Sequence, residues 1–83
     1  MVFTEYVKIR EEKFGSVIFE TLKERVFITN ETGKDILNLI EKGYSQEKIT
    51  EILAGDYGVF AQDVKEDIAN FISQLTDNKI ISL

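Results

Sequence analysis

The most concentrated group of chemically active side chains in this sequence is a set of three carboxylates. Asp63 and Asp67 are one helical turn apart, with Glu66 between them, and carboxylates at this spacing can hold a divalent cation or a basic peptide side chain. A structural role explains them better, because Asp63 and Glu66 fall in the first turn of a predicted helix, where acidic residues cap the helix and complement its dipole. We therefore predict no metal site and no cofactor.

Histidine and cysteine are both absent from the 83 residues. Their absence removes the commonest general base and the commonest neutral metal ligand, together with disulfides, thiolate zinc sites and iron–sulfur clusters. Catalytic carboxylates need a deep cleft that shifts their pKa values, and a chain of this length has room for one modest core. The sequence thus predicts a protein that binds another polypeptide, not an enzyme.

The charge and the hydropathy of the chain exclude two classes of partner. The formal net charge is −5, from 15 acidic and 10 basic residues, and such a surface repels the phosphates of nucleic acids. No apolar run approaches the length of a membrane span, and the segment from Met1 to Glu5 lacks the pattern of a signal peptide. We expect a cytoplasmic protein that binds neither nucleic acid nor membrane.

The N-terminal third has the alternating, β-branched pattern of strands. We predict strands over residues 5–10, 16–21 and 25–29, with a tight turn at residues 23–24 between the last two. A two-residue turn pairs Phe19 with Ile28 on the core face. The opposite face is then more apolar than a solvated surface should be, because it carries Ile18, Leu22 and Phe27.

The apolar period becomes helical after residue 30. The predicted helices are one from Asn30 or Thr32 to Gly43, one from Ser45 to Gly55, and one from about Ala61 to about Asn78. Residues 79–83 form a short extended piece, and no linker or repeat interrupts the chain. We therefore predict one α+β domain over residues 1–83, winged-helix-like, with a three-stranded N-terminal antiparallel sheet followed by a three-helix bundle.

The polar side of the third helix is acidic, whereas a winged helix that binds DNA needs lysine and arginine there. Phe71 falls at one margin of the apolar stripe of this helix, beside a polar edge that carries Asp67 and Gln74. An aromatic residue in this position either belongs to the core or lines a groove between the helix and its neighbour.

The third strand leaves one edge of the sheet unpaired in a simple meander. Exposed edges are usually protected by charges, proline or shortness, but residues 25–29 contain no proline and only one charged residue, Arg25. An open apolar edge beside an amphipathic helix suits β-augmentation, in which an extended peptide is added to the sheet as a further strand.

Two patterns in the sequence point to a known family. One is the Asn-x-Thr-Gly step from Asn30 to Gly33, and the other is the Asp-Ile, Phe-Ile and Leu series from Asp67 to Leu75. Together with residues 7–10, 15–19, 26–37, 39–43, 64–68 and 80–81, they give a chain that resembles the pyrroloquinoline quinone (PQQ) biosynthesis protein D family (PqqD). This family is the prototype of the recognition element for precursors of ribosomally synthesised, post-translationally modified peptides (RiPPs).

The resemblance implies a winged-helix-like domain that binds the leader region of a precursor peptide as a strand, in a groove with the third helix. Such a domain presents the peptide to a modifying enzyme, often a radical S-adenosylmethionine (SAM) enzyme, in peptide natural-product or PQQ-type biosynthesis. The acidic helix would suit a leader with basic residues. The peptide-binding residues that the resemblance implies are Arg25, Val26, Phe27, Ile28, Thr29, Asp63, Asp67, Phe71 and Gln74, with Lys65 and Ile72 as competitors on the other margin of the helix.

Two further interpretations remain open from the sequence. One is an acidic winged-helix regulatory domain that acts through protein contacts or weak DNA binding. The other is a non-catalytic subunit of a larger enzyme, bound through the apolar face of Ile18, Leu22 and Phe27. The sequence identifies neither the precursor peptide, nor its product, nor the partner enzyme, nor the oligomeric state.

Overall fold

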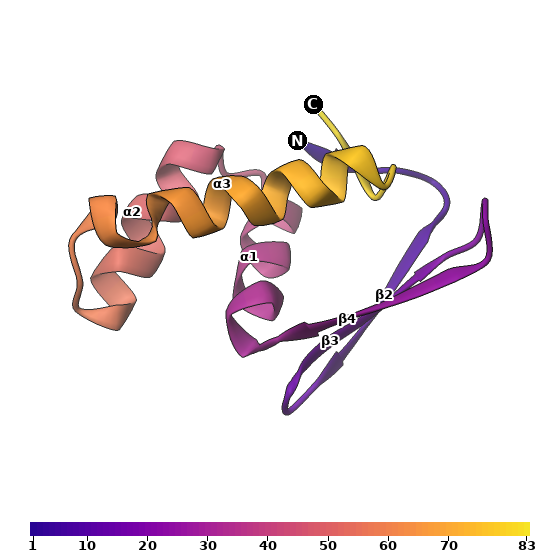
Figure 1. The fold of residues 1–83 in the computed structure, drawn as a ribbon, viewed down its shortest axis with the longest axis horizontal. Helices are drawn as coiled ribbons and strands as arrows, with labels where there is room; N and C mark the ends of the chain where they lie inside the picture. The colour runs from indigo at the N-terminus through magenta and orange to yellow at the C-terminus, as the bar shows by residue number, and fades with distance from the viewer.

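A three-stranded antiparallel sheet stands beside three helices in the computed structural model, which describes residues 1–83 (Figure 1). The sheet has the order β2-β3-β4, and a separate two-stranded sheet joins the two ends of the chain, β1 to β5. The predicted α+β class is confirmed. The elements are β1 (Val2–Phe3), β2 (Val7–Glu12), β3 (Gly15–Glu20), β4 (Arg25–Asn30), α1 (Glu31–Glu41), α2 (Gln46–Tyr57), α3 (Ala61–Asp77) and β5 (Ile81–Ser82).

The step from β4 into α1 needs no loop. Asn30 ends the strand and caps the helix, since its Oδ1 accepts a hydrogen bond of 2.9 Å from the N–H of Gly33. Of the two predicted caps Asn30 is therefore correct, and Thr32 lies inside the first turn. The end of β4 is fixed to the start of α1 by this cap.

The turn between β3 and β4 is longer than predicted, because it spans Thr21–Glu24 and not residues 23–24 alone. The carboxylate of Glu20, which is 1% exposed, accepts a hydrogen bond of 2.8 Å from the N–H of Lys23 and another of 2.8 Å from Nε of Arg25. These hydrogen bonds hold the four-residue turn against the side chain of Glu20, and in the sheet Glu20 is paired with Arg25. Leu22 is left in the loop, about half exposed.

The longer turn changes the register, so the predicted assignment of faces is wrong. Ile18 pairs with Phe27, and Phe19 pairs with Val26 instead of Ile28. Ile18 is 1% exposed in the centre of the core and Phe27 packs against it, whereas Val26 and Ile28 are 59% and 72% exposed. The face that the sequence offered to a larger enzyme is therefore the core face, and that interpretation loses its basis.

The helices extend slightly beyond or short of their predicted ends. Gly55 lies inside α2, which continues to Tyr57 and ends at Gly58 in the left-handed conformation, with φ 67°. The first helix ends as predicted, with Gly43 at φ 90° after the C-cap. None of the helices is long and apolar enough to span a membrane.

The core joins all of these elements. Its 11 buried residues come from β3, the three helices and the C-terminal segment. Figure 1 shows α1 between the sheet and α2, and α3 running lengthwise over both of these helices towards the sheet. Val7 and Ile9 of β2 pack against this core. On the other side of the sheet, α3 lies beside the outer strand β4.

Candidate functional site: a groove between β4 and α3

The backbone groups on the outer edge of β4 can be assigned from two hydrogen bonds. The N–H of Thr21 donates to the C=O of Tyr6 at 2.8 Å, and the N–H of Ser16 donates to Oγ1 of Thr29 at 3.1 Å. Odd-numbered residues of β3 thus bond towards β2 and even-numbered residues towards β4, because both backbone groups of a residue in an antiparallel strand point the same way.

This alternation identifies the free groups of β4. Ile18 and Phe27 form a hydrogen-bonded pair across β3 and β4, so the residues on either side of Phe27 bond in the other direction. The N–H and C=O groups of Val26 and Ile28 therefore point to the open edge. Both side chains lie on the outer face of the sheet and are exposed.

One side of this edge is bordered by α3. A narrow cavity of about 100 Å³ lies between the strand and the helix, and we call it the strand groove. It is lined mainly by apolar side chains, with amides on the helix side. The lining residues are Ile18, Phe27, Ile28, Thr29, Phe71, Gln74, Leu75, Asn78 and Ile80.

Arg25 closes one end of the strand groove. Its Nη1 donates to Oδ1 of Asn78 and its Nη2 to the C=O of Asn78, both at 3.0 Å, while Nε bonds Glu20. The guanidinium also lies 5.2 Å from the centre of the Phe27 ring. The start of β4 is thereby tied to the C-terminal end of α3.

The pKa of Glu20 is lowered by this arrangement. The largest cause is the hydrogen bond from the N–H of Lys23, and the hydrogen bond and charge of Arg25 act in the same direction against the burial of the carboxyl group. Glu20 therefore stays ionised and holds Arg25 in place.

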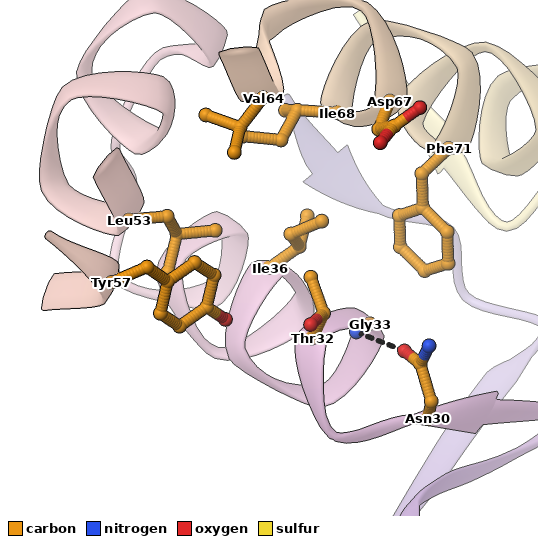
Figure 2. Close-up of a pocket in the computed structure, with 10 residues that line it drawn as sticks. All are labelled: Asn30, Thr32, Gly33, Ile36, Leu53, Tyr57, Val64, Asp67, Ile68 and Phe71. Atoms are coloured by element: carbon orange, nitrogen blue, oxygen red, sulfur yellow. Dashed lines mark hydrogen bonds between the residues drawn. The ribbon is translucent and has the colours of Figure 1, made fainter. Parts of the chain in front are cut away.

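A larger cavity of about 420 Å³ opens beyond the other end of the groove, where β4 passes into α1; we call it the end pocket (Figure 2). Figure 2 shows side chains from three helices around a central space. Phe71 lines both this pocket and the strand groove, and so stands between them. The end pocket is lined by Asn30, Thr32, Gly33, Ile36, Leu53, Tyr57, Val64, Asp67, Ile68 and Phe71.

Gly33 allows Phe71 to sit at this position. A Cβ atom at residue 33 would lie 2.6 Å from Cβ of Thr29, which is too close for real atoms, and 3.3 Å from Cε1 of Phe71, a tight contact that would press on the ring. The absence of a side chain lets the ring, the strand end and the first turn of α1 meet. The Asn-x-Thr-Gly step thus supplies both the cap of α1 and the space for Phe71.

Tyr57 forms the side of the end pocket opposite Phe71 (Figure 2). Its hydroxyl donates a hydrogen bond of 2.9 Å to Oδ2 of Asp35. The pKa of Tyr57 is raised, first by burial and then by its bond to Asp35 and the charges of Asp35 and Asp56, although a hydrogen bond from Thr32 opposes this. Sequence reasoning missed Tyr57 because it ended the second helix at Gly55, before this residue.

The structure separates the predicted residues of α3 into two groups. Asp67, Phe71 and Gln74 line the groove or the end pocket. Asp63 lines neither, and its Oδ2 accepts a hydrogen bond of 3.3 Å from the N–H of Phe60, which is the capping role weighed from the sequence.

The competing margin of α3 faces away from the groove. Ile72 is buried in the core, and Lys65 borders a shallow depression beside α2. The margin of α3 that faces β4 is therefore the one carrying Asp67, Phe71 and Gln74.

The sequence and the fold of the chain both match known proteins. The family described as coenzyme PQQ synthesis protein D (PqqD) matches residues 9–81. The fold matches TbiB1 in complex with the TbiA(beta) leader peptide, with a TM-score of 0.88 and 21% sequence identity over 96% of this chain and 93% of that chain. It also matches lasso peptide synthetase B1 complexed with the leader peptide, with a TM-score of 0.83 and 20% identity over 94% of this chain and 92% of that chain. No curated protein matches the sequence.

Proposed function

The chain belongs to the PqqD family, and from this premise we propose that it binds the leader region of a ribosomally synthesised precursor peptide and presents it to a modifying enzyme. The resemblance drawn from the sequence is thereby confirmed as to family. The leader is added as a strand to the open edge of β4. The domain acts by positioning the peptide, and the chemistry belongs to its partner.

The observation that carries this proposal is the pair of free backbone positions on β4. The N–H and C=O groups of Val26 and Ile28 offer four hydrogen-bonding groups to an added strand, at an edge with no proline. Backbone bonds of this kind give affinity for any extended peptide. Selectivity must come from the side chains around the edge.

The strand groove supplies such side chains. An added strand has alternate residues on each face of the sheet, so peptide residues opposite Phe27 and Thr29 point towards α3. There they meet Phe71 and Gln74, which favours apolar side chains of the leader. Arg25 acts in this proposal as the tie between strand and helix, and a contact of Asp63 with the peptide stays a prediction.

The similar solved structures support the proposal without deciding it. Both are complexes of those proteins with leader peptides, and both share this fold at about one-fifth sequence identity. A radical SAM enzyme is the partner that the family resemblance favours. This chain has no cysteine and cannot itself hold the iron–sulfur cluster of such an enzyme through thiolates.

The direct test is a titration of the isotope-labelled protein with the leader peptide encoded beside its gene, followed by NMR. We expect saturable shifts concentrated at residues 25–30 and at the Asp67, Phe71 and Gln74 margin of α3. Absence of saturable binding would overturn the proposal. Salt-sensitive binding to duplex DNA at the same residues would favour the regulatory interpretation instead.

A further inference from the structure

We propose that the end pocket selects a lysine or arginine side chain of the leader peptide, with the apolar stem enclosed and the cation held by Asp67. This inference rests on the proposed function and adds a chemical preference to it.

The position of the pocket places it along the path of an added strand. The pocket begins at Asn30, directly after the free groups of Val26 and Ile28, and shares Phe71 with the strand groove. Residues of an extended peptide that face α3 recur every second position. A peptide side chain opposite Phe27 lies in the groove, and the next one on the same face passes Phe71 towards the pocket.

The lining suits a long side chain with an apolar stem. The walls are formed by Ile36, Leu53, Val64 and Ile68, which face the central space in Figure 2. Lysine and arginine bury their methylene groups against such surfaces while the charged end stays near water. A cavity of about 420 Å³ is large enough for either side chain.

The charge of the pocket is negative and is not neutralised. Asp67 is the one ionisable carboxylate among the lining residues, and no lysine or arginine lines the pocket. Asp67 is absent from the three ion pairs of the chain, which join Arg10 to Glu12, Arg25 to Glu20 and Lys48 to Glu51.

The surroundings of the pocket add to this negative charge. At its edge Asp35 accepts a hydrogen bond from the hydroxyl of Tyr57. The nearby Lys34 does not line the pocket, and its ammonium group donates instead to the C=O of Glu12 at 2.9 Å. An apolar peptide side chain would cover Asp67 without giving it a partner, and an acidic one would be repelled. A basic side chain pairs with it through a charge-assisted hydrogen bond.

The test is selection from a random peptide library displayed on phage, with the intact protein as bait. The variants are Asp67→Lys, Asp67→Asn and, as a matched control, Glu66→Lys, which makes the same change of charge at an exposed neighbouring position of α3 that lines neither cavity. Wild type should enrich peptides with alternating apolar residues and a lysine or arginine at one end of the series, two positions from the nearest apolar residue. Asp67→Lys should exchange this basic position for aspartate or glutamate, and Glu66→Lys should keep it.

A binding measurement then isolates the charge. In one enriched peptide the basic residue is replaced by norleucine, which keeps an apolar stem and removes the cation. We expect about tenfold weaker binding to the wild type, a smaller difference at high salt, and no difference for Asp67→Asn.

The outcomes separate the inference from the proposed function. Enrichment of apolar peptides without a basic position, or a basic position that survives Asp67→Lys, overturns the inference and leaves strand addition intact. Failure to enrich any peptide overturns both.

Discussion

The two outer strands of the same sheet, β2 and β4, differ in the number of charged side chains along their free edges. In β2, Lys8, Arg10 and residues 11–12 are all charged, whereas β4 has a single charged side chain, Arg25, which turns back towards Glu20 and Asn78. Charges on an edge strand prevent other strands from adding to it. The sheet is therefore protected on one side and open on the other, and stability alone gives no reason for the open side.

The largest expected effect comes from a proline at matching positions on the two edges. Ile28 and Glu11 both have their N–H directed to an open edge, by the alternation of hydrogen bonds across β3. Proline is tolerated on an edge strand but cannot donate to an added one. Ile28→Pro should weaken leader binding on the order of tenfold or more, while Glu11→Pro leaves it unchanged, as measured by calorimetric titration. Equal effects of the two variants would mean that the open edge of β4 is not used.

Replacing each of the two arginines in turn tests whether the contacts of Arg25 at the start of β4 stabilise the protein more than the surface ion pair of Arg10 on β2. Arg25→Ala removes three hydrogen bonds and leaves the buried Glu20 without its cation, so we expect a clear fall in melting temperature and weaker leader binding. Arg10 pairs with Glu12 on the exposed face of β2, and Arg10→Ala should change the unfolding free energy by about 1 kcal/mol or less. Thermal unfolding of both variants decides this, and equal losses of stability would contradict it.

A pair of glycine variants examines the other end of β4. Gly33→Ala brings a methyl group against Thr29 and Phe71, and it should destabilise the protein by about 1–3 kcal/mol and displace the ring between groove and pocket. Gly55 is exposed on α2, and a Cβ atom added there has no other atom within 4 Å. Gly55→Ala should therefore stabilise the protein by up to about 1 kcal/mol. Chemical denaturation gives both values. Stabilisation by Gly33→Ala would show that Phe71 does not depend on this close approach.

The smallest expected effect is on the stability of the fold at low pH. Because the pKa of Glu20 is lower in the folded protein than its ordinary value of 4.5, Glu20 stabilises the fold above that value, and the stabilisation is lost as the pH falls through the folded-state pKa. Glu20→Gln keeps an acceptor for Lys23 but cannot titrate. The unfolding free energy of the wild type should therefore fall more steeply below about pH 4.5 than that of Glu20→Gln. If the unfolding free energies of the two proteins fall in parallel with pH, ionisation of Glu20 does not contribute to the stability of the fold.

Much of the fold could be predicted because its signals are local. Alternation identified the three strands, helical periodicity identified the three helices, and Asn30 marked the boundary between them. The register could not be predicted, because a buried carboxylate at Glu20 decides the length of the turn through bonds to Lys23 and Arg25. The pairing of the two chain ends through β1 and β5 was likewise missed, because it joins residues at opposite ends of the sequence.

The candidate site was predictable where it lies on one element and not where it joins several. The open edge of β4 followed from the pattern of the strand. For α3 the resemblance named the margin with Phe71 but left Lys65 and Ile72 on the other margin as competitors. The end pocket did not, because its walls come from three helices and include Leu53 and Tyr57 of α2. Leu53 belongs to the apolar side of its helix and Tyr57 has no pattern of its own, so neither residue signals a pocket, and only the packing of α2 against α3 brings them to Asp67.

The cap at Asn30 and the tie at Arg25 have a consequence for the energy of association. They anchor β4 at both ends, to α1 and to α3, so the receiving strand loses little conformational freedom when it acquires a neighbour. The ordering entropy, about 1–2 kcal/mol for each residue fixed, then falls almost wholly on the incoming peptide. Its own flexibility before contact becomes a determinant of affinity, and a leader already biased towards extended backbone should bind more tightly than an equally complementary but more flexible one.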